Sequence, residues 1–317
     1  MKRVVIWMVA IGFLFGSAVL ANAATYKWMT FDYPNASYTY PQDIYGDKIV
    51  GYAVDSWSNG YSFVYDYKQK TWTTLDSDYN SDNAPDIWEA DGISGNVIVG
   101  RSYFYKGFSY DLETKVWKDI GYPGDNVDQT WARGIDGDNI VGWWDDYNHY
   151  YSFLYNNNNG NYTTLSINNN FIKDIQANDI SGNYIVGTLY DYAFLYDLSD
   201  SSLTVLYYLN SGNTIFAGID GSKVVGYYDT DPYDGVPWHG LIYDIQTGEW
   251  QTVDYPAASA TEIEGIYGST IVGTYWDGNG HHGFVASPVP LPPSLLLLGS
   301  GVLGLLGFRR KKGNLAS

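Results

Sequence analysis

The residues of this sequence best suited to binding chemistry are aromatic side chains that recur close to carboxylates. In several places a Val-Gly pair is followed within a few residues by Trp or Tyr and then by Asp. Flat aromatic rings stack on the apolar faces of sugar rings, while carboxylates and amides hydrogen-bond the sugar hydroxyls. The candidate ligand-binding residues are Trp57, Trp88, Trp131, Trp143, Trp144, Asp145, Asp229, Asp231, Trp276 and Asp277. In the alternative interpretation, the aromatic rings pack between structural elements and the aspartates cap turns.

Metal and cofactor sites have little support in the sequence. Segments 229–235 (DTDPYDG) and 277–282 (DGNGHH) are rich in oxygen ligands that suit Ca²⁺, but neither has the twelve-residue spacing of an EF-hand. We therefore predict no cofactor and no metal site, with Ca²⁺ as the weak alternative.

Catalytic motifs are absent from the sequence as well. It has four His residues and contains neither a Gly-x-Ser-x-Gly nucleophile motif nor a glycine-rich phosphate loop. Two facing carboxylates could still act as acid and base on a glycosidic bond. We predict a non-enzymatic binding protein, with a polysaccharide-cleaving enzyme or a purely structural surface protein as alternatives.

A sixfold internal repeat must position these residues. The copies are IYGDKIVG (44–51), ISGNVIVG (93–100), IDGDNIVG (135–142), ISGNYIVG (180–187), IDGSKVVG (219–226) and IYGSTIVG (266–273). Each Gly-Asp, Gly-Asn or Gly-Ser pair suits a two-residue hairpin, since Gly accepts the positive φ of a type II′ turn. The glycine that ends each copy predicts either close packing against the adjacent repeat or a β-bulge.

Two further strands complete each repeat. A segment such as YSFVYD (61–66) follows every copy, and in the first five repeats a segment such as TWTTLD (71–76) comes next. Four short strands in about 44 residues match one β-propeller blade.

The two ends of the repeat region complement each other. The sixth repeat lacks its fourth strand, while YKWMTFDYP (26–34) resembles GEWQTVDYP (248–256), which contains the fourth strand of the fifth repeat. We predict an all-β, six-bladed β-propeller of four-stranded blades over residues 24–287, with an N-terminal strand completing the last blade. Such closure removes two free sheet edges. The candidate binding residues would lie mostly in loops on one face.

Composition limits the partners. The formal net charge of −18 and the pI of about 4.3 exclude a nucleic acid partner, because a phosphate backbone would be repelled. The absence of cysteine means that no disulfide holds the fold together.

Both termini carry targeting signals. Residues 1–23 combine a basic start, an apolar core and Ala21-Asn22-Ala23, which predicts a cleaved signal peptide; an uncleaved membrane anchor is the alternative. Residues 288–317 combine a Pro-rich joint, an apolar segment (294–308) and a basic tail with Arg309 and Arg310. The basic cluster orients this tail to the cytoplasmic side.

This tail resembles the PEP-CTERM sorting signal of Gram-negative bacteria, with Val289-Pro290-Leu291-Pro292 where the family pattern has Val-Pro-Glu-Pro. The resemblance implies an exosortase-type processing enzyme as a partner. It also implies export to the cell surface or beyond, with transient inner-membrane attachment through the tail, and an association with extracellular polysaccharide. A plain C-terminal membrane anchor is the alternative.

The repeats themselves are similar to bacterial HAF repeats, named for a His-Ala-Phe motif. Here the motif reads His282-Gly283-Phe284, His239-Gly240-Leu241 and Tyr192-Ala193-Phe194. Members of that family are predicted extracellular repeat proteins of unassigned activity, so the resemblance implies fold and location rather than a reaction.

Overall fold

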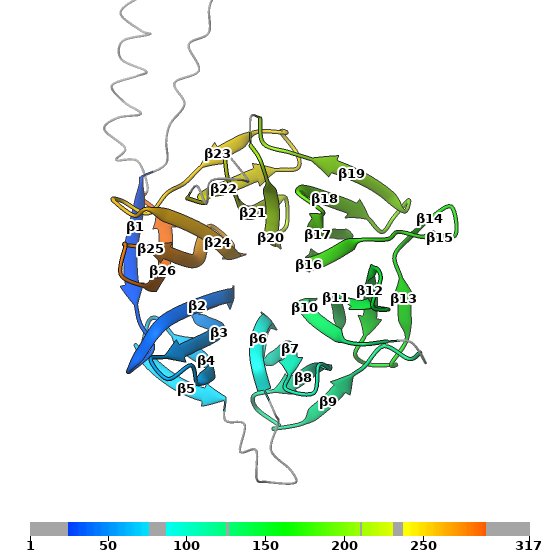
Figure 1. Cartoon of the computed structure of the whole chain (residues 1–317), viewed down its shortest axis with the longest axis horizontal. Coiled ribbons are helices and arrows are strands. Elements are labelled where there is room, and N and C mark those ends of the chain that lie inside the picture. The colour runs from blue at the N-terminus through cyan, green and yellow to red at the C-terminus, as the bar shows by residue number, and fades with distance from the viewer. Residues whose placement is uncertain (1–24, 76–86, 125–126, 210, 231–236, 290–317) are drawn as a thin grey trace, which may run out of the picture. The chain divides into compact units, whose positions relative to one another are not determined.

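The fold is a ring of six four-stranded antiparallel sheets around a central axis (Figure 1). The computed structural model describes residues 25–75, 87–124, 127–209, 211–230 and 237–289, and these contain strands and no helix. The prediction of an all-β, six-bladed propeller is therefore confirmed. Nothing within the described ranges is a helix long and apolar enough to cross a membrane.

Blades 1 to 5 run from the innermost to the outermost strand in chain order, and blade 6 takes its outermost strand from the N-terminus. Blade 1 comprises β2 (Ala36–Tyr45), β3 (Lys48–Asp55), β4 (Gly60–Asp66) and β5 (Thr71–Leu75); blade 2, β6 (Ile87–Ser94), β7 (Val97–Ser102), β8 (Gly107–Asp111) and β9 (Trp117–Ile120); blade 3, β10 (Thr130–Asp136), β11 (Asn139–Asp145), β12 (Tyr150–Asn156) and β13 (Tyr162–Thr164). Blade 4 comprises β16 (Ile175–Ser181), β17 (Tyr184–Leu189), β18 (Tyr192–Asp197) and β19 (Ser202–Leu206); blade 5, β20 (Thr214–Asp220), β21 (Lys223–Tyr228), β22 (His239–Asp244) and β23 (Trp250–Thr252); blade 6, β24 (Ala260–Tyr267), β25 (Thr270–Trp276), β26 (His281–Pro288) and β1 (Tyr26–Phe31).

The N-terminal strand closes the ring. The sheet of blade 6 has the order β1-β26-β25-β24, so β1 occupies the outer position that the sixth repeat lacks (Figure 1). The Trp28 ring packs edge-on against Phe284 of β26, with ring centroids 5.1 Å apart. In blade 5, Trp250 of β23 also packs on a third-strand ring, that of Tyr243, in a tilted arrangement with centroids 4.4 Å apart. The similarity of segments 26–34 and 248–256 is thus that of equivalent strands in adjacent blades.

The repeated motif forms a hairpin in every blade. In blade 1, Tyr45 pairs with Lys48, and Gly46 between them has φ +60°. The equivalent glycines have φ between +56° and +61°, while the residues that follow them do not have positive φ. This is the pattern of the type II′ turn that the sequence predicts.

A β-bulge faces the last glycine of each motif. In blade 3 the pairing of β10 with β11 shifts between Ala132 and Gly134, next to Gly142. A Cβ on Gly142 would overlap the carbonyl oxygen of Trp131 in the same blade. The expected packing of this glycine against the adjacent blade is wrong, because the first strand of its own blade fills the space; the alternative, a bulge, is found in that facing strand.

Close approach between blades does occur, at glycines of the first strand. A Cβ on Gly92 of blade 2 would lie 2.6 Å from the carbonyl oxygen of Arg133 in blade 3. A Cβ on Gly265 of blade 6 would lie 2.7 Å from the Cα of Asp43 in blade 1. These glycines allow six strands to converge on one axis.

The core lies between the blades. Third-strand side chains are its largest fully buried members and include Phe63, Phe108, Phe153, Phe194 and Phe284. Outer-strand aromatics cover them, as where Trp117 stacks on Phe108 with centroids 4.4 Å apart. Buried aromatic area of this kind, rather than disulfides, holds the ring together.

The His-Gly-Phe and Asp-Tyr-Pro motifs meet in space. In blade 6, His282 Nδ1 lies 2.9 Å from the Asp32 carboxylate that follows β1. In blade 5, His239 Nδ1 lies 3.0 Å from Asp254, which also accepts a hydrogen bond from the Gly240 backbone. Each pair connects the third and fourth strands of one blade.

Two features fall outside the repeat pattern. A short hairpin, β14 (Ser166–Ile167) with β15 (Asn170–Phe171), is inserted between blades 3 and 4, and both turn residues, Asn168 and Asn169, have positive φ. The predicted signal peptide (1–23) and nearly all of the predicted sorting signal (288–317), including Pro290, Pro292, Arg309 and Arg310, lie outside the described residues.

Candidate functional site

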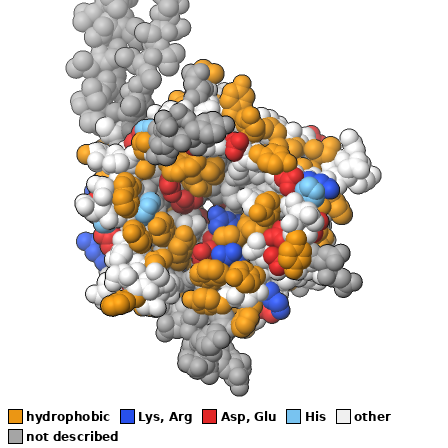
Figure 2. Space-filling model, in the orientation of Figure 1, with side chains coloured by type: hydrophobic (Ala, Val, Ile, Leu, Met, Phe, Trp, Pro, Cys, Tyr) orange, Lys and Arg blue, Asp and Glu red, His pale blue; other side chains and the backbone are white. Residues whose placement is uncertain are grey.

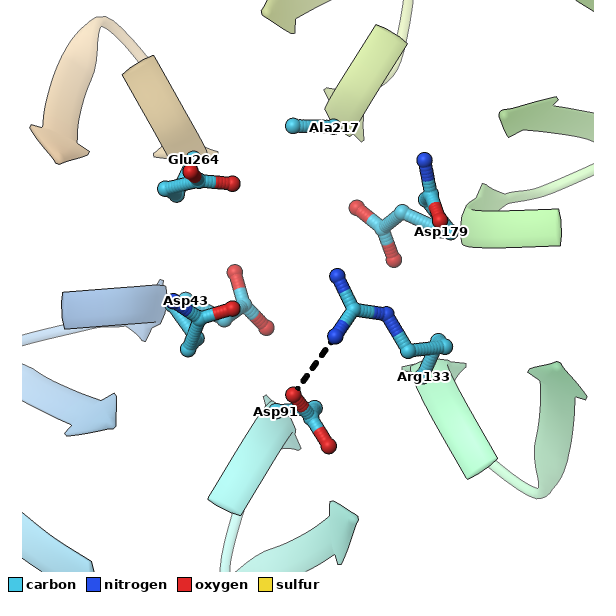
Figure 3. Close-up of a pocket in the computed structure, with 8 residues that line it drawn as sticks. Asp43, Asp91, Arg133, Asp179, Ala217 and Glu264 are labelled. Atoms are coloured by element: carbon cyan, nitrogen blue, oxygen red, sulfur yellow. Dashed lines mark hydrogen bonds and ion pairs between the residues drawn. The ribbon is translucent and has the colours of Figure 1, made fainter. Parts of the chain in front are cut away.

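The six bulges direct one side chain each toward the ring axis. Together with two aspartates they line a small polar pocket, whose residues are Gln42, Asp43, Asp91, Arg133, Asn178, Asp179, Ala217 and Glu264 (Figure 3). On the face seen in Figure 2, acidic and basic side chains gather around the central hollow. Because the extra residue of a bulge is unpaired, it can be aimed away from the sheet.

Charge on the axis is mostly acidic. Arg133 Nη1 lies 2.8 Å from Asp91 Oδ1, and Trp131 donates its indole N–H to Asp91 Oδ2 at 2.6 Å (Figure 3). Burial, followed by the charge of Glu262, raises the pKa of Glu264 to about 8. Burial alone raises the pKa of Glu262 to about 7. Burial therefore favours the protonated form of both carboxyls.

Asp43 and Asp179 join neighbouring blades at the axis. Asp43 accepts hydrogen bonds from the backbone N–H groups of Ile44 and of Ile93 in blade 2, at 2.7 and 2.8 Å. Asp179 makes the same pair of bonds with Ile180 and with Ile219 of blade 5, both at 2.8 Å. Burial raises the pKa of both carboxyls despite these bonds. Both carboxylates therefore have a structural role, joining adjacent blades.

One face of the ring carries the loops between second and third strands and the links between blades; we call it the loop-rich face. On it, Arg101 of blade 2 lies between two indole rings, with its guanidinium carbon 4.4 Å from the Trp88 centroid and 3.8 Å from that of Trp131. The series continues from Trp131 to Trp143 at 5.1 Å and from Trp143 to Tyr150 at 5.3 Å. We call Trp88, Arg101, Trp131 and Trp143 the blade 2–3 stack.

A salt bridge fixes this stack. Arg101 Nη2 lies 3.5 Å from Glu89 Oε2, and only 11% and 13% of the two side chains are exposed. Tyr103 extends the stack outward, since its ring is parallel to that of Trp88 at 5.5 Å. The result is a rigid aromatic base beneath more exposed rings.

Exposed aromatic side chains stand on the loops of four consecutive blades. Trp57, Tyr105, Tyr147 and Tyr190 lie in the loops between second and third strands of blades 1 to 4, with 85%, 51%, 76% and 67% of their surfaces exposed. We call these four residues the exposed aromatic row. Tyr105, Tyr147 and Tyr190 have φ values of +59°, +68° and +52°.

A carboxylate stands beside three members of this row. The backbone N–H of Trp57 donates to Asp55. A hydrogen bond with Asp128 raises the pKa of Tyr147. Tyr190 Oη donates to Asp174 at 2.7 Å. Stacking surface and hydrogen-bonding groups therefore alternate along the row.

The structure brings only some of the predicted site residues together. Trp88, Trp131 and Trp143 meet in the blade 2–3 stack, and Trp57 lies in the exposed aromatic row. Trp144 instead packs between Tyr122 and Tyr151, at 4.4 and 4.5 Å.

The remaining predicted residues lie elsewhere. Trp276 packs on His281 at 4.8 Å, near Tyr40, in a separate aromatic group between blades 6 and 1. Asp145 and Asp229 are buried and hydrogen-bonded to Gln129 and Asn213 respectively. Asp277 caps a turn through the backbone N–H groups of Asn279 and Gly280. Asp231 lies outside the described residues.

Sequence reasoning did not single out Tyr105 and Tyr147, or the axial charges. One tyrosine among 32 in a loop carries no signal of its own exposure. The bulges could be anticipated from the repeated glycine, but not the side chains that they direct to the axis.

Metal ligands do not converge in the described part of the chain, where no group of three or more His, Asp or Glu side chains could hold an ion. The 229–235 segment is only partly described. In segment 277–282, Asp277 Oδ2 lies 3.5 Å from His282 Nε2, an ion pair rather than a ligand set.

Comparison with known proteins supports the fold alone. Neither a protein-family model nor a curated protein matches the sequence. The structure is similar to TolB from Acinetobacter baumannii (TM-score 0.50, 14% identity), with 77% of this chain covered; the chain spans 65% of that protein's length. It is also similar to a TolB-like protein from Agrobacterium tumefaciens (TM-score 0.53, 13% identity), covering 82% of this chain and 93% of that one. The chain is a β-propeller protein.

Proposed function

We propose that this protein is an exported, surface-associated binding or matrix protein that holds extracellular polysaccharide on the loop-rich face of its propeller, without cleaving it. The observation that carries the proposal is the exposed aromatic row on the loop-rich face, of which Tyr105 contacts the blade 2–3 stack. Rings that protrude from a fixed base lose little entropy when a sugar stacks on them.

The location in this proposal rests on the terminal signals of the sequence. A signal peptide would export the chain. A PEP-CTERM-like tail would present it to an exosortase-type enzyme, with membrane contact only through that tail. An acidic surface also suits a protein that must stay soluble outside the cell.

Binding to a panel of purified bacterial and plant polysaccharides tests the proposal. We expect the full chain to bind at least one polymer and to release no soluble fragments from it. Trp57→Ala together with Tyr147→Ala should weaken binding, because both rings are exposed and neither supports the core. The matched control is Tyr267→Ala. Tyr267 is 40% exposed and lies at a hairpin on the opposite face, so its loss should not affect binding. No binding to any polymer would contradict the proposal, and fragment release would favour the enzyme alternative.

A further inference from the structure

Three members of the exposed aromatic row occupy a backbone conformation that suits glycine. Tyr105, Tyr147 and Tyr190 have φ near +60° in loops of different length. An L-residue with a bulky side chain rarely adopts this region, because its Cβ approaches the following carbonyl oxygen. A strained aromatic residue recurs in three consecutive blades. This recurrence indicates that the aromatic side chain itself is required at these positions.

Among the fully described loops of this kind, the row occupies those of blades 1 to 4. In blade 6, the other blade whose corresponding loop is fully described, Gly278 has the positive φ, at +98°. There Trp276 is only partly exposed and packs on His281. The same loop thus accepts glycine where no exposed ring is present.

Hydrogen bonds connect the row from blade to blade. Thr130 of blade 3 donates its backbone N–H to the carbonyl of Tyr105 in blade 2, at 2.9 Å. Asp174 donates its backbone N–H to the carbonyl of Tyr150 in blade 3, at 2.7 Å, and its carboxylate accepts from Tyr190 of blade 4. His149 Nδ1 lies 3.1 Å from the same carboxylate. These bonds tie the loops of Tyr105 and Tyr190 to blade 3 and to the link that follows it.

We infer that the ligand is an extended polysaccharide chain that lies across blades 1 to 4, with one sugar unit stacked on the ring of each blade. This inference rests on the proposed function and specifies the ligand: a linear polymer rather than a mono- or disaccharide. The Asp174 carboxylate, shared by Tyr190 and His149, supplies an acceptor for sugar hydroxyls between two stacking positions. The axial pocket is not part of this surface, since its lining side chains lie at the ring axis rather than on the loops.

Chain length provides the test. For a polysaccharide that the full chain binds, the polymer, its hexasaccharide and its disaccharide are titrated by calorimetry. Several linked contacts should make the hexasaccharide at least ~100-fold tighter than the disaccharide. If no polymer binds, the proposed function fails; if the disaccharide binds as tightly as the hexasaccharide, the proposed function survives and the extended chain is wrong.

Glycine substitutions locate the contacts. Tyr105→Gly, Tyr147→Gly and Tyr190→Gly should each weaken hexasaccharide binding by about 3- to 10-fold, the effect of one stacked ring. Because glycine accepts positive φ, each variant should keep the fold although the contacts of its ring are lost, and thermal unfolding separates lost binding from lost fold. Tyr190→Phe keeps the ring and should retain most of the affinity. An effect confined to one of the three positions would overturn the inference.

Discussion

The guanidinium of Arg101 contacts two indole rings, pairs with the carboxylate of Glu89 and donates a hydrogen bond to Gln129. Removing it would leave a mostly buried carboxylate without its cation and two rings without the group between them. At the residue scale, therefore, the base of the proposed binding surface depends on one side chain.

We predict that Arg101→Ala lowers the free energy of unfolding by about 2–4 kcal/mol, because a largely buried ion pair and two cation–π contacts are lost. Arg101→Lys keeps the charge but not a planar group between the rings, and should cost about half as much. Urea denaturation measures both. Equal stability of the Ala variant and the natural protein would contradict this account of the stack.

Two buried carboxyls of blade 6 predict a stability that depends on pH. Glu264 and Glu262 have pKa values raised to about 8 and about 7, so the folded state holds protons that the unfolded state has already released. Their contribution is complete at acidic pH and is lost as the pH rises through the range between the unfolded and folded pKa values.

We expect the melting temperature to fall between about pH 5 and about pH 9, and Glu264→Gln to reduce that fall. Glu249→Gln, at an exposed position, is the control and should leave the profile unchanged. A melting temperature that rises over this range would show that these groups are ionised in the fold.

At the scale of the element, the bulge opposite a second-strand glycine is the unit from which every blade is built. It directs one side chain to the axis and leaves no space for a Cβ on the glycine. The hairpin glycine is required for a different reason. In blade 3, nothing lies within 4 Å of a Cβ added to Gly137, and only its φ of +57° is unusual.

Two substitutions in blade 3 distinguish a glycine that has no space for a Cβ from a glycine that is needed only for its positive φ. Gly142→Ala should cost about 3 kcal/mol or more, because its Cβ would overlap the Trp131 carbonyl. Gly137→Ala should cost about 1 kcal/mol, the strain of one left-handed residue. Chemical denaturation of both variants gives the comparison, and the reverse order would refute the role assigned to the bulge.

The strands and hairpins could be predicted from the sequence because glycine, β-branched and aromatic residues recur at fixed spacing. The inserted hairpin β14–β15 could not, since its turn is formed by Asn168 and Asn169 inside an asparagine-rich run without repeats. The candidate site was only partly predictable. Trp88 and Trp131 were recognisable as candidates. They are brought together through Arg101, which packs between their two rings and has no sequence signature.

At the scale of the whole ring, closure depends on β1. Phe31 is 6% exposed and its ring lies 4.8 Å from Tyr65 of blade 1, so this strand joins the last blade to the first. Its loss would expose β26 as a free edge and open a core cluster that includes Ile44 and Phe63.

We predict that deleting residues 25–33 sharply destabilises the propeller or prevents its folding. Phe31→Ala keeps the strand and is a milder change, which should lower the free energy of unfolding by about 3–5 kcal/mol. Thermal and chemical unfolding measure both variants. A deletion variant that melts at the same temperature as the natural protein would mean that the ring does not need this strand.

The most direct test of polysaccharide binding on the loop-rich face is hydrogen exchange of the full chain, with and without a polysaccharide that it binds. The account predicts added protection in loops 56–59, 103–106, 146–149 and 190–191, on the loop-rich face of blades 1 to 4. The hairpins on the opposite face, such as 46–47 and 268–269, should exchange unchanged. Protection of those hairpins instead, or of no loop on blades 1 to 4, would contradict a polysaccharide-binding surface at this place.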